Sequence, residues 1–292
     1  LPGRVRKTHE WSLTAMRPVL HGDRIYARQM YGDTTSLVCL DKATGQPIWT
    51  AIHRRDHDII SDPMIVQDHL VCLTMARTSQ LESAVRFTEF DPETGTIWRE
   101  RDLITLSNAW HRRQVCEVQT FCDGMVAVLG GVVVSCDADG QLRWVSRQIL
   151  LPPDEQPDWV TQTFSPPLVF SDTAHVADGG VSLHRDQIYI TEPGVRALQC
   201  LDAETGDLIW TRTLPDLKRL LGISGGCLIA HGHERLLGLD LMTGETRWRH
   251  SIEPLLHGHL CGGEHGILVA RRQPIDDKNT TFVPELVWLD GK

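Results

Sequence analysis

The string LDAETGDLIW at residues 201–210 decides the fold, because nearly the same string, LDKATGQPIW, stands at residues 40–49. Both runs place an aspartate, a Thr-Gly pair and a tryptophan at identical intervals. A string that returns along a chain of 292 residues is typical of a protein built from one repeated supersecondary unit.

Further copies appear when the chain is aligned on the aspartate. The copy that starts at Asp91 is one residue short after its glycine, and the copy that starts at Asp137 lacks the threonine and is one residue short before its glycine. A sixth copy begins at Asp290. The expected repeat residues are Asp41, Gly45, Trp49, Asp91, Gly95, Trp98, Asp137, Gly140, Trp144, Asp202, Gly206, Trp210, Asp240, Gly244 and Trp248.

Each copy reads as the turn of a β-hairpin. A short apolar run precedes the aspartate, and a second run ends in the tryptophan. The aspartate can accept hydrogen bonds from backbone N–H groups two or three residues on, and glycine supplies the positive φ that ends such a loop. A tryptophan at so constant a position predicts contact with the neighbouring unit, so we expect the units to stack through these indoles.

Two further strand-like segments precede each hairpin, for example DPMIV and LVCLTM in the second unit. Four short strands per unit, with glycine turns and no long helical pattern, predict an all-β fold. We expect a single β-propeller domain over residues 1–292, made of four-stranded antiparallel blades. The expected blades are residues 19–50, 63–99, 115–146, 165–212, 219–250 and 259–292, the last joined by 8–13.

Closure of the ring concerns the last blade. Its segment PELVWLDGK, at 284–292, supplies a third strand, and THEWSL, at 8–13, supplies a fourth that ends near Trp11. A propeller must join its last blade to its first or expose sheet edges. The sequence therefore predicts a closed six-bladed ring, and the alternative is a piece of a chain with seven or eight blades.

Composition and charge exclude some partners. The formal net charge of −9 argues against a surface for nucleic acid, and no run of about 18 apolar residues exists to span a membrane. The chain opens LPGRVRKTHEW, without Met and without an apolar signal core. We expect a mature or excised form, and oligomeric state stays open.

The D-x-x-T-G-x-x-x-W string resembles the pyrroloquinoline-quinone-like repeat of quinoprotein-type β-propellers, and the resemblance runs from about residue 19 to the end. It implies an extracytoplasmic, periplasmic location. It also implies one of two functions: a scaffold that binds proteins, or a dehydrogenase whose central funnel holds the quinone and calcium. Those dehydrogenases commonly carry two adjacent cysteines beside the quinone, and this chain has no adjacent pair.

Loop length separates the two faces of the expected propeller. With strands named A to D in each blade, most of the long loops fall at the D–A and B–C connections, and loops on a rigid scaffold commonly carry binding residues. Arginine and histidine there could receive an acidic ligand or a partner segment, although solvated charges paired with Asp56 and Asp58 are the simpler explanation. The candidate binding residues are His53, Arg54, Arg55, His57, Trp110, His111, Arg112, Arg113 and Trp159.

Histidine and cysteine give no clear site. The pairs His231/His233 and His257/His259 have a spacing that can chelate a metal, but ordinary loop histidines are expected and no metal is predicted. The eight cysteines lie mostly in strand-like stretches and read as buried thiols, with Cys116–Cys122 as one candidate bridge.

The sequence favours a non-catalytic scaffold that binds a protein or peptide partner on the D–A/B–C loop face. It contains no phosphate-binding glycine loop and no His-Glu-x-x-His. We therefore assign no catalytic residue and expect no cofactor. The alternatives are a quinone-dependent dehydrogenase, or a hydrolase or lyase on the same fold.

Overall fold

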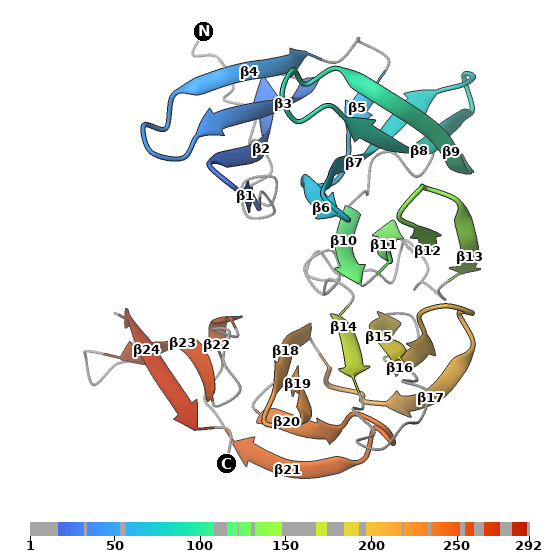
Figure 1. Ribbon diagram of the computed structural model, residues 1–292. Coiled ribbons are helices and arrows are strands. Elements are labelled where there is room, and N and C mark those ends of the chain that lie inside the picture. The colour runs from blue at the N-terminus through green and yellow to red at the C-terminus, as the bar shows by residue number, and fades with distance from the viewer. Residues whose placement is uncertain are drawn as a thin grey trace, which may run out of the picture. The chain divides into compact units, whose positions relative to one another are not determined.

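The computed structural model describes most of the chain, and every regular element in the described residues is a strand (Figure 1). The strands pair with their neighbours in antiparallel fashion. The all-β fold of four-stranded antiparallel sheets predicted from the repeats is thereby confirmed. The described residues are 17–31, 34–52, 57–107, 116–121, 123–129, 132–147, 168–173, 184–192, 197–217, 219–232, 235–251, 255–259, 266–274 and 282–290.

Two compact units divide the chain, and each is described by itself. The first comprises Leu1–Gly130 and Val134–Arg143, and the second comprises Gly131–Val133 and Trp144–Lys292. The division passes through the third sheet.

The first unit holds two complete sheets and most of the third. The first sheet has the order β1 (Val19–His21), β2 (Arg24–Tyr31), β3 (Thr34–Asp41) and β4 (Pro47–Ile52). The second has the order β5 (His57–Ile59), β7 (His69–Arg77), β8 (Glu82–Phe90) and β9 (Ile97–Ser107), with β6 (Met64–Val66) also paired to β7. The third has the order β10 (Cys116–Phe121), β11 (Gly124–Leu129), β12 (Val132–Asp137) and β13 (Leu142–Arg147).

The second unit holds the remaining sheets. The fourth has the order β14 (Leu168–Thr173), β15 (His184–Glu192), β16 (Ala197–Asp202) and β17 (Leu208–Thr213). The fifth has the order β18 (Arg219–Ser224), β19 (Cys227–His231), β20 (Arg235–Asp240) and β21 (Thr246–Ser251). The last has three strands among the described residues, β22 (Leu255–His259), β23 (Gly266–Pro274) and β24 (Phe282–Asp290).

The repeat aspartate closes the turn between the third and fourth strands of a sheet. In the first sheet, Asp41 Oδ1 accepts hydrogen bonds from the backbone N–H of Thr44 at 2.7 Å and from its hydroxyl at 2.6 Å. The N–H of Gly45 then donates to the carbonyl of Asp41 at 2.8 Å, with a φ of 70° at the glycine. The aspartate thus satisfies turn N–H groups, and glycine adopts the left-handed conformation that side chains disfavour.

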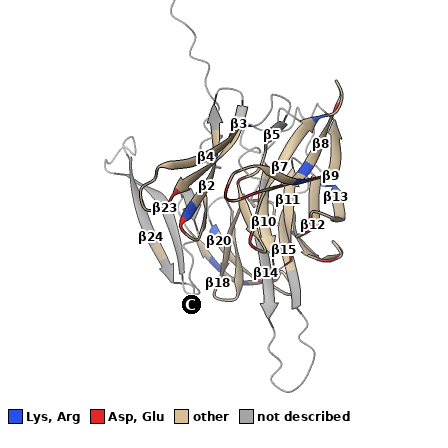
Figure 2. Ribbon diagram, turned by 45° about the horizontal axis from the view of Figure 1, so that its top comes forward, with Lys and Arg blue, Asp and Glu red and all other residues tan. Residues whose placement is uncertain are grey.

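The turns of one sheet share a face. The N–H of Lys42 donates to the carbonyl of Asp23 at 2.9 Å, and the N–H of Ala138 donates to the carbonyl of Asp123 at 2.9 Å. Each bond joins the turn before the second strand to the turn after the third. The acidic residues of these turns are red in Figure 2.

A regular register shift follows each turn. In the first sheet, Leu40 pairs with Pro47 and Cys39 with Trp49, so the intervening Ile48 has no opposite residue. The same shift occurs in the second, fourth and fifth sheets. Such an extra residue sits in a β-bulge and reverses the face to which the following residues point. In these four sheets, the residue four places after the turn glycine therefore takes the same place in the ladder.

Candidate functional site

The contact between the first and second sheets depends on Trp49. Its indole Nε1–H donates to the carbonyl of Pro92, in the turn of the second sheet, at 3.0 Å. The hydroxyl of Tyr26 donates to the same carbonyl at 3.4 Å, and the two rings lie with centroids 5.9 Å apart. A Cβ atom added at Gly95, in that turn, would lie 2.6 Å from the Trp49 ring. The glycine therefore allows the turn to lie directly on the indole.

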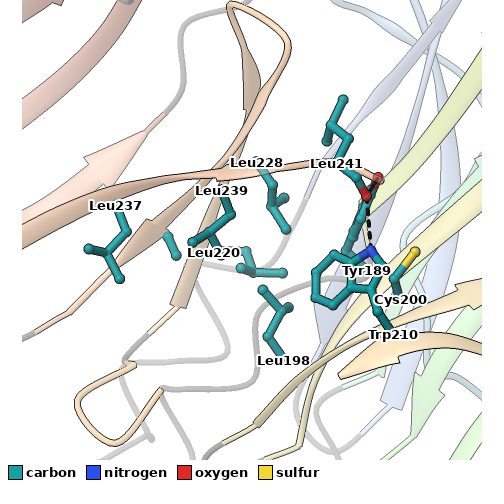
Figure 3. Packing of buried hydrophobic residues seen from close by; sticks show 10 residues of the cluster. Tyr189, Leu198, Cys200, Trp210, Leu220, Leu228, Leu237, Leu239 and Leu241 are labelled. Atoms are coloured by element: carbon teal, nitrogen blue, oxygen red, sulfur yellow. Dashed lines mark hydrogen bonds between the residues drawn. The ribbon is translucent and has the colours of Figure 1, made fainter. Parts of the chain in front are cut away.

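The contact between the fourth and fifth sheets repeats this arrangement (Figure 3). Trp210 Nε1–H donates to the carbonyl of Leu241 at 2.9 Å, and the Tyr189 hydroxyl donates to the same carbonyl at 3.2 Å. A Cβ atom at Gly244 would lie 2.7 Å from the Trp210 ring. Cys200 stands between the two rings in the sheet, paired with Tyr189 on one side and with Trp210 on the other.

Trp144 makes the same contact with the turn of the fourth sheet. Its Nε1–H donates to the carbonyl of Ala203 at 2.9 Å, and a Cβ atom at Gly206 would lie 2.7 Å from its ring. In all three cases the accepting carbonyl belongs to the residue directly after the repeat aspartate. An indole stacked on a glycine turn, with its N–H bonded to that turn, joins one sheet to the next.

The contact between the second and third sheets differs, and the prediction for Trp98 is wrong. Its side chain is 63% exposed, because Trp98 is the bulged residue three places after Gly95. Arg99, four places after Gly95, takes the ladder position opposite Glu89. Its guanidinium donates to Asp139 Oδ1, in the turn of the third sheet, at 2.7 Å. An ion pair thus stands where the other sheets place an indole.

A buried carboxylate supports this polar contact. Glu89 accepts a hydrogen bond from Arg99 Nε at 2.9 Å and lies 2.5 Å from His69 Nδ1, although its side chain is only 3% exposed. The hydrogen bond from Arg99 holds the pKa of Asp139 below its ordinary value. Beside it, a Cβ atom at Gly140 would lie 2.5 Å from Phe87.

The remaining repeat tryptophans are Trp248 and Trp11. Trp248 pairs across the ladder with Gly238, whose missing side chain makes room for the indole. The turn that Trp248 would meet, at 290–292, reaches beyond the described residues, and Trp11 lies outside them.

The predicted binding residues fall outside the described part of the chain. His57 is a partial exception, because its backbone opens β5 and pairs with Ala76. Their role on the loop face therefore stays a prediction. The residues whose side chains lie outside the described part are His53, Arg54, Arg55, His57, Trp110, His111, Arg112, Arg113 and Trp159.

The second sheet carries one described part of that loop face. Its strands β7 and β8 have 9 residues each. Its last strand, β9, has 11 residues, whereas the last strands of the first, third and fourth sheets, β4, β13 and β17, have 6. The hairpin that joins β7 to β8, opposite the repeat turn, ends in Leu81, which is 75% exposed. Sequence reasoning placed this loop on the binding face but did not single out Leu81, whose signal is an apolar residue in an otherwise polar loop, ARTSQLES.

A cleft of about 300 Å³ lies between strands β1, β6 and β10 of the first unit. Its apolar lining includes Val19, Met64 and Val118, and its polar lining includes Asp62 and Gln119. This volume is at the lower end of the range for small-ligand pockets. The cleft has room for a small molecule or for one or two side chains of an inserted peptide.

Asp62 is the carboxylate in the lining of this cleft. It follows Ser61, which lies between β5 and β6, the two strands that pair with β7. The hydroxyl oxygen of Ser61 accepts a hydrogen bond from the N–H of Leu73, in β7, at 2.8 Å. Arg28 Nε lies 3.8 Å from Asp62 Oδ1, which is an ion pair without a hydrogen bond. Burial raises the pKa of Asp62, and the backbone N–H of Arg17 and the charge of Arg28 oppose that rise.

Within the part of the chain that the structure describes, no three His, Cys, Asp or Glu side chains gather closely enough to hold a metal ion. Burial raises the pKa of the Cys136 and Cys200 thiols to about 12 each, which disfavours their reactive thiolate form. Cys122, the candidate partner of Cys116, lies outside the described residues.

The repeated sheets and their turn contacts define a β-propeller of PQQ-like repeats. The family model described as outer membrane protein assembly factor BamB matches residues 3–177 and, a second time, residues 131–258. These matches cover more than half of the chain, so the chain belongs to this family. Among curated proteins, no sequence matches it.

Solved structures give the same fold. BamB from Moraxella catarrhalis is 16% identical with a TM-score of 0.57, and the match covers 93% of this chain and 74% of that one. The quinohemoprotein alcohol dehydrogenase of Comamonas testosteroni is 12% identical with a TM-score of 0.56. That match covers 87% of this chain and 55% of the dehydrogenase, so the chain spans about half of its length. At these identities the likeness shows the fold alone.

Among the described residues, the structure contains no helix with the length and apolar character needed to cross a membrane.

Proposed function

We propose that the chain is a non-catalytic β-propeller scaffold that binds a protein or peptide partner on the face of its D–A and B–C loops. The observation that carries the proposal is the second sheet, whose extended strands present Leu81, 75% exposed, on that face. Loops carried on a rigid scaffold commonly hold the binding residues of a protein. The family's description as an assembly factor for outer membrane proteins supports the same proposal and an extracytoplasmic, periplasmic location.

Photo-crosslinking tests the choice of face. A photoreactive amino acid at Leu81, or at Arg112 in the predicted loop patch, should form adducts with a protein partner in the native compartment. The same amino acid at Glu204, an exposed position in a repeat turn, should form none. Adducts from Glu204 that equal those from Leu81 would refute the proposed face.

The dehydrogenase alternative has only the shared fold in its favour. Pyrroloquinoline quinone added with calcium should leave the melting temperature unchanged and produce no dye-coupled oxidation of alcohols. A stoichiometric quinone with turnover would replace the scaffold proposal by the enzyme.

The proposed scaffold is a ring of six sheets, in which residues 8–13 pair with β24 and complete the three-stranded last sheet. The support is the expected strand THEWSL and the open edge that the described part of the last sheet leaves at β24. Trp11→Ala should accelerate amide hydrogen exchange in β24 without affecting β20. An equal change of the exchange rate in both strands would reject this closure.

A further inference from the structure

We propose that the contact between the second and third sheets is an electrostatic joint that loosens reversibly at high ionic strength or low pH, while the indole contacts stay closed. We call this contact the polar joint, formed by His69, Glu89, Arg99 and Asp139 with Phe87 against Gly140. It gives the first unit one place at which neighbouring sheets can separate.

The polar joint contains charges in place of the indole contact. Arg99 donates to Glu89 in its own sheet and to Asp139 in the next, so one guanidinium bridges the two sheets. In the first sheet, the same ladder positions hold Cys39 and Trp49. Both members of the ladder pair differ between the two sheets, because a carboxylate and a guanidinium replace the thiol and the indole. The buried carboxylate of Glu89 therefore has a cationic partner.

Salt ions can screen the ion pair of Arg99 and Asp139, which joins the second sheet to the third. The side chains of Arg99 and Asp139 are 31% and 63% exposed, and exposed ion pairs are screened by salt. By contrast, the bond from Trp144 to the carbonyl of Ala203 joins uncharged groups. Added salt therefore weakens the first contact and leaves the second unchanged.

Acid acts on the same atoms. Asp139 has a lowered pKa in the folded protein, so its contact with Arg99 is fully present above the ordinary pKa of an aspartate and is lost as the pH falls through the lowered value. The charged groups that face it are Arg99, Arg101 and His69. The two guanidinium groups keep their charge in acid, so protonation of Asp139 removes the carboxylate of the third sheet that Arg99 meets.

Hydrogen exchange read by mass spectrometry tests the proposal on the whole chain. Raising the salt from about 0.1 M to about 1 M should speed amide exchange in residues 137–144 by about threefold, the loss expected for an exposed ion pair. Residues 202–210, which meet Trp144, should not change. Equal responses of the two turns would overturn the proposal.

A matched pair of variants separates the ion pair from general turn stability. Asp139→Asn removes the charge that Arg99 meets, and Glu204→Gln changes the residue at the same turn position of the fourth sheet. Asp139→Asn should show the fast exchange of residues 137–144 already at low salt, with no further response to salt. Glu204→Gln should behave as the unaltered chain. Salt dependence that persists in Asp139→Asn would show that the joint is not electrostatic.

Discussion

The contact between the first and second sheets differs from the contact between the second and third because Trp98 is displaced by one position along its strand. Between the first and second sheets, Trp49 stacks on Gly95 and donates to the carbonyl of Pro92. Between the second and third, Arg99 takes the place of the indole and Trp98 points to solvent. The comparison teaches that ladder position, not the presence of tryptophan in the repeat, decides which side chain joins two sheets.

The turn glycine is the reference point for that position. Four places after it stand Trp49, Arg99, Trp144, Trp210 and Trp248. Trp98 is the second residue of β9, whereas Trp49 is the third residue of β4. The bulge that exposes Ile48 in the first sheet therefore exposes Trp98 in the second. A one-residue shift in a strand reverses the face of a side chain.

The largest expected effect separates a joining tryptophan from the displaced one. Trp210→Ala should lower the free energy of unfolding by about 4 kcal/mol, because it empties a buried indole site and leaves the carbonyl of Leu241 with fewer donors. Trp98→Ala should lower it by less than about 0.5 kcal/mol, as expected for an exposed side chain. Urea denaturation of both variants measures the difference, and equal losses would contradict the account.

A smaller effect is expected at the turn glycines. Gly206→Ala places a methyl group against the Trp144 ring at a φ of 76° and should cost about 3 kcal/mol. Gly45→Ala meets no atom within 4 Å at a φ of 70° and should cost about 1 kcal/mol. Thermal denaturation compares the two. If they cost the same, the indole does not press on the turn.

The ion pair of the second sheet should contribute less. Glu89→Ala removes the buried carboxylate and should cost about 2 kcal/mol in unfolding free energy, because Arg99 loses its partner within the sheet. Arg99→Ala added to it should cost little more, since the two act together. A double-mutant cycle with no coupling would show that the ladder pair is not an interacting unit.

Much of the fold could be predicted from the sequence, because turn chemistry is local. Asp41, Thr44 and Gly45 make the turn bonds that their residue types require. The face of Trp98 was missed because the alignment counted tryptophans as equivalent, although the missing residue after Gly95 signalled the change. The cleft beside Asp62 depends on strands from three sheets, and no local pattern in the sequence brings them together.

The smallest expected effect concerns the turn carboxylates. The hydroxyl of Thr44 is the main reason that the pKa of Asp41 lies below its ordinary value. Thr44→Val should raise that pKa toward the ordinary value, so the stability that the turn contributes would begin to fall at a higher pH during acidification. Titration of the Asp41 carboxyl by NMR measures the shift, with Thr50→Val as the control. An unchanged pKa would show that the hydroxyl does not hold the carboxylate.

Exchange of the indole N–H protons tests the central claim most directly. In a two-dimensional NMR spectrum, with each signal assigned by a Trp→Phe variant, the N–H of Trp49, Trp144 and Trp210 should exchange with solvent far more slowly than the N–H of Trp98. This is expected because the first three donate to a carbonyl of the neighbouring sheet and Trp98 is exposed. A Trp98 N–H as protected as the other three would contradict the account.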